Sequence, residues 1–316
     1  MLLNNKVCFM YMRMLPLIFI GIFLGVGSYL GLFNGFKEQV YNYILVYKKP
    51  SDWNDRGVDY ITGHGVSQNY QQAAKWFRKS AKQGEAFAQR NLGILYATGI
   101  GGSQDYNEAF KWFRKAAEKN DPVAEFNLGV MYELGLGVSY NTSEAFKWIN
   151  KSAKQGFRDA ERDLGLMYLM GKAVPQNHNE AIIWIRKAAE KGDRMAQVTL
   201  GTMYAAGYGK VIVQNYIEAM KWFSHAAKQG DAIAQYNIGV LFYKGKGVTK
   251  NVKEGVKWFH LAAKQGLPQA QFALAMCSEC GEVIFQNNIE EHKVLEKTAN
   301  NGYPKTIEIL QNFNLH

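Results

Sequence analysis

The chain has 316 residues, of which 47% are hydrophobic and 20% are charged, and it contains only six prolines. This composition supports a buried core and excludes extensive disorder. The net charge of +10 is spread along the chain without a run of lysine or arginine, which argues against a nucleic-acid-binding protein. Three cysteines are too few for a disulfide scaffold, so we expect the fold to depend on packing.

The first part of the chain has the pattern of a membrane anchor. A basic segment, residues 1–13, precedes residues 14–33, which are uncharged and long enough for a helix that crosses the hydrocarbon layer. The flanking charges predict that residues 1–13 are cytoplasmic. The rest of the chain is then extracytoplasmic, or periplasmic in a Gram-negative bacterium. A cleaved signal peptide is the alternative, because Val26-Gly-Ser28 offers small residues for cleavage.

Two pairs of glycines within the predicted membrane helix have the spacing that lets membrane helices approach closely. The pairs are Gly21 with Gly25 and Gly27 with Gly31. They predict a homodimer through this face of the helix. Residues 34–50, which contain several tyrosines and lysines, are expected to form an interfacial linker.

A tryptophan recurs at nearly constant spacing along residues 51–302. The intervals are 36, 36, 36, 38 and 36 residues, which indicates a stack of one supersecondary unit. The excess of two residues falls within Lys210-Val-Ile-Val213, which we expect to be a loop, where an insertion leaves the stack intact. We expect the tryptophans, because of their fixed helical register, to belong to the core. They are Trp76, Trp112, Trp148, Trp184, Trp222 and Trp258.

Each unit carries signals for the start and the end of a helix, which we call helix B. An Asn or Asp suited to N-capping is followed three residues later by Glu or Gln, as in a capping box. Gly or Asn marks the end, since these residues tolerate the left-handed conformation. The predicted caps are Asn69, Asp105, Asn141, Asn177, Asn215, Asn251 and Asn287. The predicted ends are Gly84, Asn120, Gly156, Gly192, Gly230, Gly266 and Gly302.

Helix B has a 3.6-residue apolar stripe that includes Ala109, Trp112 and Phe113 in the second full unit. The preceding helix, helix A, contains an interior glycine in six units, although glycine costs about 1 kcal/mol there relative to alanine. The simplest reason is that a neighbouring helix or the Trp ring packs against bare backbone. These glycines are Gly57, Gly93, Gly129, Gly165, Gly201 and Gly239.

The unit resembles the Sel1-like repeat, a relative of the tetratricopeptide repeat. Ala124-Glu-Phe-Asn-Leu-Gly-Val-Met-Tyr132 and the following Ala145-Phe-Lys-Trp148 show the resemblance well. It covers residues 51–302 and implies an all-α fold, an α-solenoid of about seven Sel1-like helix-turn-helix repeats. The transmembrane helix predicted from the apolar run 14–33 precedes this solenoid. Residues 303–316 are expected to form a C-terminal capping helix, because terminal units of a solenoid are atypical.

The resemblance also implies candidate partner-binding residues. In the related tetratricopeptide repeats helix A lines a concave groove, and the residue before the Leu-Gly pair often holds the main chain of a bound peptide. Two neighbouring arginines are able to reach a carboxylate. The alternative is that these side chains bond within the turn or to the adjacent unit. The candidates are Asn91, Asn127, Asp163, Thr199, Asn237, Arg90 and Arg162.

The sequence contains no grouping that favours catalysis. The Cys277-Ser-Glu-Cys280 motif is the sharpest local candidate, and it is interpreted as two buried small residues or as a disulfide, with metal or redox chemistry as the third alternative. A zinc site would require two further ligands at suitable spacing, and only His292 is near. No two histidines stand four residues apart, and the Gly-x-Ser-x-Gly and Ser-x-x-Lys motifs are absent. We therefore expect no metal, no cofactor and no enzymatic activity.

Taken together, the patterns predict a membrane-anchored scaffold that binds a protein or peptide partner through the concave face of its A helices. The alternative is a secreted or host-directed factor with the same repeats, released by signal cleavage. A hydrolase that acts on the cell wall is a third hypothesis.

Overall fold

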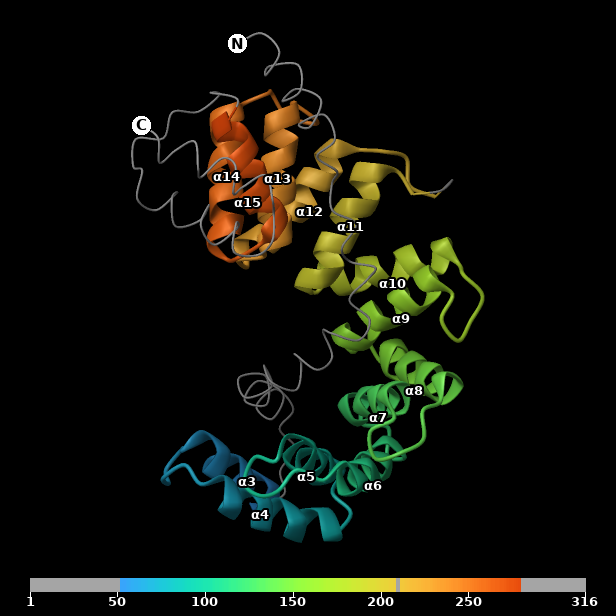
Figure 1. Cartoon of the computed structure of the whole chain (residues 1–316). Coiled ribbons are helices and arrows are strands. Elements are labelled where there is room, and N and C mark those ends of the chain that lie inside the picture. Colours follow the sequence, from blue (N-terminus) through green and yellow to red (C-terminus); the bar gives the residue numbers. More distant parts are fainter. Residues whose placement is uncertain (1–51, 209–210, 280–316) are drawn as a thin grey trace. The chain divides into compact units, whose positions relative to one another are not determined.

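The computed structural model describes residues 52–208 and 211–279 (Figure 1). The predicted membrane helix 14–33, the linker 34–50 and the capping helix 303–316 lie outside the described residues. Among the residues that the structure does describe, none of the helices combines the length and the apolar character needed to cross a membrane.

The described residues form thirteen α-helices and no strand, which confirms an all-helical solenoid. The A helices are α3 (Asp52–Thr62), α5 (Ala86–Thr98), α7 (Pro122–Leu134), α9 (Arg158–Met170), α11 (Arg194–Ala206), α13 (Ala232–Lys244) and α15 (Pro268–Glu279). The B helices are α4 (Tyr70–Lys82), α6 (Tyr106–Ala117), α8 (Thr142–Lys154), α10 (His178–Glu190), α12 (Tyr216–Lys228) and α14 (Val252–Lys264).

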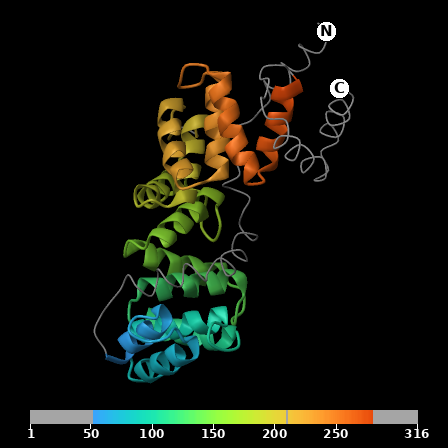
Figure 2. The same ribbon diagram turned by 90° about the vertical axis from the view of Figure 1, so that its left-hand side faces the viewer.

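The chain divides into two compact units, one of which ends at Ala188 while the other begins at Ala189. In the first unit each helix from α3 to α9 packs on the next, and in the second unit the same holds from α11 to α15. Figure 2 shows the A and B helices of successive hairpins lying side by side within each unit. Their cores consist mainly of alanine, leucine, isoleucine and phenylalanine contributed by both helices of each hairpin.

The predicted caps of helix B are confirmed for the six that the structure describes. In each, the Asn or Asp side chain accepts a hydrogen bond from the backbone N–H three residues later, as Asn141 does from Glu144 at 3.1 Å. The predicted ends are confirmed as well, with positive φ at all six from Gly84 to Gly266, including 62° at Asn120. Asn287 and Gly302 lie outside the described residues.

The capping-box prediction is wrong in its second half. The N–H of each N-cap donates to a carbonyl of the preceding A helix, for example from Asn141 to Tyr132 at 2.9 Å, and this bond recurs in six hairpins. Because that N–H is already bonded, the acidic residue three positions on turns elsewhere. Glu144 accepts from the indole Nε1 of Trp148 at 3.1 Å and from Lys147 at 3.2 Å. The cap therefore joins helix A to helix B instead of closing on itself.

The interior glycines of the A helices lie against helix B, as predicted, but the Trp ring is not their neighbour. A Cβ added to Gly93 would stand 2.8 Å from Phe113, and one added to Gly129 would stand 2.6 Å from Ile149. In each of the six described hairpins that have this glycine, the contact is made by the residue after the tryptophan. The predicted core tryptophans pack against the buried core residues without being fully buried themselves, as Trp112, Trp148, Trp184 and Trp258 do. They are half-buried, and Trp112 carries the Lys115 ammonium 4.3 Å from its ring centroid.

Candidate functional site

The seven candidate residues on the A helices form a set that we call the polar ladder. All seven are buried: none exposes more than 9% of its surface. Because burying a polar group without a partner is costly, each of these side chains needs hydrogen bonds inside the protein. The residues are Arg90, Asn91, Asn127, Arg162, Asp163, Thr199 and Asn237.

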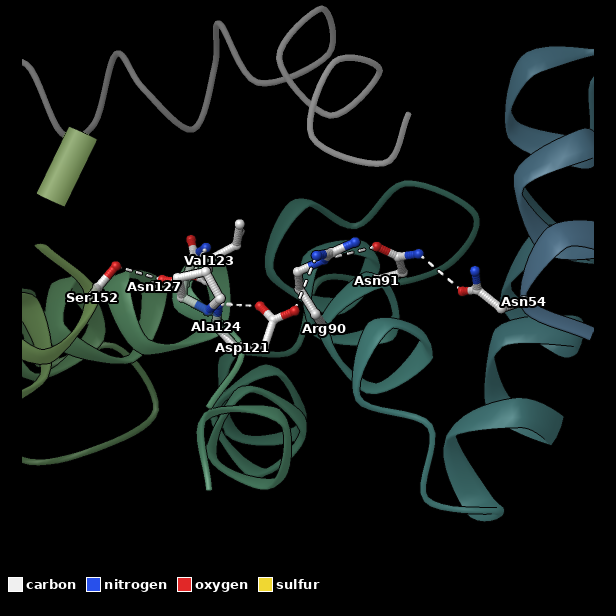
Figure 3. Close-up of polar contacts among 9 residues, drawn as sticks. Asn54, Arg90, Asn91, Asp121, Val123, Ala124, Asn127 and Ser152 are labelled. Atoms are coloured by element: carbon white, nitrogen blue, oxygen red, sulfur yellow. Dashed lines mark hydrogen bonds and ion pairs between the residues drawn. The ribbon is translucent and has the colours of Figure 1, made fainter. Parts of the chain in front are cut away.

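In the first unit the ladder joins three successive hairpins, as Figure 3 shows. The Asn91 side-chain amide donates to Asn54 Oδ1 of α3 at 3.2 Å, and Arg90 Nε donates to Asn91 Oδ1 at 3.2 Å. Arg90 also forms an ion pair of 3.0 Å with Asp121, which lies at the start of α7. A continuous run of polar contacts therefore links α3, α5 and α7.

Asp121 has two structural roles. It caps α7 by accepting from the Ala124 N–H at 2.8 Å, and it neutralises Arg90. Burial raises the pKa of the Asp121 carboxyl, and the Arg90 guanidinium offsets part of this rise. The Asp121 side chain is only 2% exposed and the Arg90 side chain only 1%. Removing either one would leave a buried charge unpaired, at a cost of about 3–5 kcal/mol.

Other ladder residues bond within their own helix. The Asn127 amide donates to the Val123 carbonyl at 2.8 Å, and the Thr199 hydroxyl donates to Met195 at 2.8 Å. Arg162 Nε pairs with Asp163 next to it at 2.7 Å. These contacts match the alternative in which the side chains serve the structure of the repeat itself.

Two further acidic residues of α7 are buried and paired with lysines, one from α8 of the same hairpin and one from the loop of the next hairpin. Glu125 lies 2.9 Å from Lys151 of α8, and Glu133 pairs with Lys172 after α9. Burial raises the pKa of both glutamates, and the lysines offset part of that rise. The A helices of this unit thus contribute buried acids, which lysines of other segments reach from a more exposed position.

Sequence reasoning missed one recurring group, the N-caps of helix A. Asp121, Asp193 and Asp231 each accept from the N–H three residues later, at 2.7–2.9 Å. The signal was available, because each aspartate stands three residues before an alanine at the same position of the repeat. It went unnoticed because other repeats have Glu, Phe or Leu there.

The Cys277–Cys280 motif is only partly described. Cys277 is buried in α15, and Cys280 lies outside the described residues, so the disulfide stays a prediction. Within residues 52–208 and 211–279 no group of three or more His, Cys, Asp or Glu residues is arranged to hold a metal ion. The geometry of the ladder is that of a structural network, with no nucleophile paired to a base.

The repeat period, the caps and the hairpin geometry define a class of helical repeat protein. The family model for the Sel1 repeat matches seven segments: 57–85, 86–121, 122–157, 158–193, 194–231, 232–267 and 268–291. The chain belongs to the Sel1 repeat family. None of the curated proteins compared with the chain matches it.

Two solved structures are similar to the chain at 30% sequence identity. One is c5321, described as a protective antigen present in uropathogenic Escherichia coli strains, with a TM-score of 0.72 over 92% of this chain. The chain spans 66% of the length of that protein. The other is a Sel1 repeat protein from Oxalobacter formigenes, with a TM-score of 0.69, and the match covers 79% of this chain and 97% of that one.

Proposed function

We propose that the protein is a non-catalytic scaffold, anchored to a membrane by residues 14–33, whose repeats bind a protein or peptide partner through the face formed by the A helices. Sel1 repeat proteins in general bind protein partners. In this proposal residues 1–13 are cytoplasmic and the repeats are extracytoplasmic. The paired glycines Gly21/Gly25 and Gly27/Gly31 are proposed to bring two copies together.

The observation that carries the proposal is the contrast between constant and variable positions among the repeats of one chain. Positions that cap helix B, end it or pack at a hairpin hold nearly the same residue type each time. The two ladder positions vary, from Arg90-Asn91 to Phe126-Asn127, Arg162-Asp163, Val198-Thr199 and Tyr236-Asn237. A shared structural role requires constancy, whereas recognition of a non-repetitive partner requires a face whose chemistry changes from repeat to repeat.

The internal bonds of the ladder restrict how a partner is held. Arg90 and Arg162 are already paired with carboxylates, so we assign them a positioning role. Asn127 is the most accessible ladder residue, and its amide donates to a carbonyl of its own helix. That donor is able to exchange to a partner carbonyl without breaking a contact between repeats, so we place main-chain recognition there.

The test replaces Asn127 with alanine in the full chain. We expect capture of partner by crosslinking from native membranes to fall several-fold while the melting temperature stays within a few degrees. Thr98→Ala is the matched control, because the Thr98 hydroxyl makes the same kind of bond, to the Ile94 carbonyl at 2.8 Å, near the end of α5 and outside the ladder. Equal capture by both variants would remove Asn127 from the proposed binding face.

A secreted form is the second candidate, and the description of c5321 as a protective antigen favours it, since an antigen has to be accessible outside the cell. The mass of the mature N-terminus separates the two. An intact residue 1–33 segment supports the anchor, whereas a chain that begins near Tyr29 supports secretion after signal cleavage.

A further inference from the structure

The second unit has an edge at which two A–B loops present exposed aliphatic and lysine side chains. The loop after α11 carries the two-residue insertion, and Tyr208 and Ile212 close it with two backbone bonds of 2.9 and 3.1 Å. Ile212 is buried by this arrangement, whereas its neighbours point outward. Val213 is 84% exposed, Val211 is 42% exposed, and Ile217 at the start of α12 is 59% exposed.

The next loop, between α13 and α14, supplies the lysines. Lys246, Lys250 and Lys253 are exposed, and no acidic residue stands between positions 244 and 253. Lys244 is half-buried, and burial lowers its pKa, with a smaller contribution from the nearby Lys246. The acids at the starts of the adjoining B helices pair with other lysines: Glu218 with Lys221 and Glu254 with Lys257.

Tyr216 joins the two loops into one surface. The Lys246 ammonium donates to the Tyr216 hydroxyl at 2.8 Å and lies 4.7 Å from the centroid of its ring. Gly247 packs so closely on the start of α12 that an added Cβ would stand 2.6 Å from the Tyr216 Cβ. The lysine loop is thus held beside Ile217, the residue that follows Tyr216. We call Val211, Val213, Ile217, Lys246, Lys250 and Lys253 the loop edge.

Packing does not require these side chains. At the position of Lys250 most other repeats have a glutamine whose amide bonds the last turn of helix A, as Gln104 does with Ala97 at 2.8 Å. At the position of Lys246 the fourth repeat has Lys172, which is paired with Glu133. The residue that corresponds to Glu133 in the second unit is Ala205, so Lys246 has no such carboxylate. These departures from the repeat pattern indicate a role outside the fold.

We propose that the loop edge binds the surface of a membrane that contains anionic lipids. Exposed aliphatic side chains enter the headgroup region, and lysines beside them gain from the negative surface potential. An acidic protein is the alternative binding partner that the positive charge of the loop edge would attract. The composition argues against it, because the buried centre of a protein interface is depleted in lysine and enriched in aromatic residues and arginine. The proposal does not rest on partner binding by the A helices.

The test measures lysine acetylation by mass spectrometry on the full chain mixed with, or reconstituted into, lipid vesicles. Vesicles of phosphatidylcholine alone are compared with vesicles that contain phosphatidylglycerol. We expect Lys246, Lys250 and Lys253 to react at least about three-fold more slowly on the anionic vesicles, and salt to reverse the effect, since surface attraction is screened. Lys82, Lys154 and Lys228, which are exposed near the ends of B helices, are the internal controls.

Because both vesicle types offer the same hydrocarbon layer, attachment through residues 14–33 affects them equally. The variant Val211→Ser with Val213→Ser is expected to lose most of the protection. The matched control, Ile183→Ser with Leu261→Ser, removes two aliphatic side chains of 48% and 46% exposure elsewhere and is expected to keep it. Equal acetylation on the two vesicle types would overturn the proposal, even if an acidic protein protected the lysines. Protection that survives the valine replacements would overturn the role of the aliphatic residues.

Discussion

The A and B helices of one hairpin are equal in length and differ in how they are buried. Helix α7 buries residues on all sides, including Glu125, Asn127 and Glu133, whereas α8 buries only the stripe of Ala145, Ile149, Ser152 and Ala153. Helix B faces the interior with one side, so its polarity alternates with the helical period. Most residues of helix α7 are buried, so its polar residues need partners inside the protein. In this repeat, therefore, the apolar stripe of helix B fixes how the hairpin packs, and helix A contains the polar residues that vary from one repeat to the next.

The largest expected effect concerns the side chain of helix B that packs against the interior glycine of helix A. Phe113→Ala should lower the free energy of unfolding by about 3–5 kcal/mol, because Phe113 is fully buried against Gly93. Trp112→Ala should cost about 1–2 kcal/mol, since the indole is half-buried and partly covered by Lys115. Chemical denaturation followed by circular dichroism measures both. A larger loss for Trp112 would reverse the assignment of the core.

The second prediction concerns the interior glycine of helix A. Gly93→Ala should destabilise by about 1–3 kcal/mol, because the new Cβ would stand 2.8 Å from the Phe113 ring. In the presence of Phe113→Ala the same change should cost much less, which a double-mutant cycle detects. Gly102→Ala is the control, since nothing lies within 4 Å of its added Cβ. Additive effects of the two substitutions would show that Phe113 is not the obstacle.

The third prediction separates the two halves of the cap of helix B. Asn141→Ala should cost about 1 kcal/mol, because the amide oxygen accepts from the N–H groups of Ser143 and Glu144. Glu144→Ala should cost about 0.5 kcal/mol or less, since the carboxylate bonds exposed or half-buried side chains and not the N-cap backbone. Thermal unfolding of the two variants side by side gives the comparison. Equal losses of stability in the two variants would support the original capping-box prediction, in which Glu144 bonds the N-cap backbone.

The fourth prediction is a gain in stability at the loop between the helices. Ala173 has a φ of 63° at a position where other repeats have glycine. Ala173→Gly should stabilise by about 0.5–1 kcal/mol, because relief of the left-handed strain exceeds the added entropy of the unfolded chain. Gly101→Ala should act in the opposite direction, since its Cβ would stand 2.5 Å from the Tyr70 carbonyl oxygen. Melting temperatures that change in the same direction would contradict this account.

The fifth prediction uses pH to probe the buried acids of helix A. Because burial raises the pKa of Glu133 in the folded state, the folded protein binds its proton more tightly than the unfolded chain does. Stability from this group therefore falls as the pH rises through the raised pKa. The melting temperature of Glu133→Gln relative to the native protein should increase between pH 4 and pH 7. Glu108→Gln on the outer face of α6 is the control for loss of a charge. A melting temperature of Glu133→Gln that falls relative to the native protein over this pH range would contradict the raised pKa of Glu133.

Much of the fold was predictable because its signals are local. The caps such as Asn141 and the ends such as Asn120 act on residues within one helical turn, so their sequence pattern suffices to place them. The period of 36 residues predicted the repeat, and the 38-residue interval placed the insertion in a loop, where Val211 and Val213 now lie. The helix-A cap Asp121 was missed because its signal is present in only some of the repeats.

The chain by itself determined where each described helix B begins and ends, how many residues separate the repeats, and that the glycines of helix A meet a neighbouring helix. Only the tertiary structure decided that Phe113 and not Trp112 fills that contact, and that Arg90 is buried against Asp121. The physical reason is one of range. A cap or a turn depends on atoms within a few residues, whereas burial depends on contacts with another helix, such as Gly93 with Phe113 and Arg90 with Asp121, which the pattern of one helix does not specify.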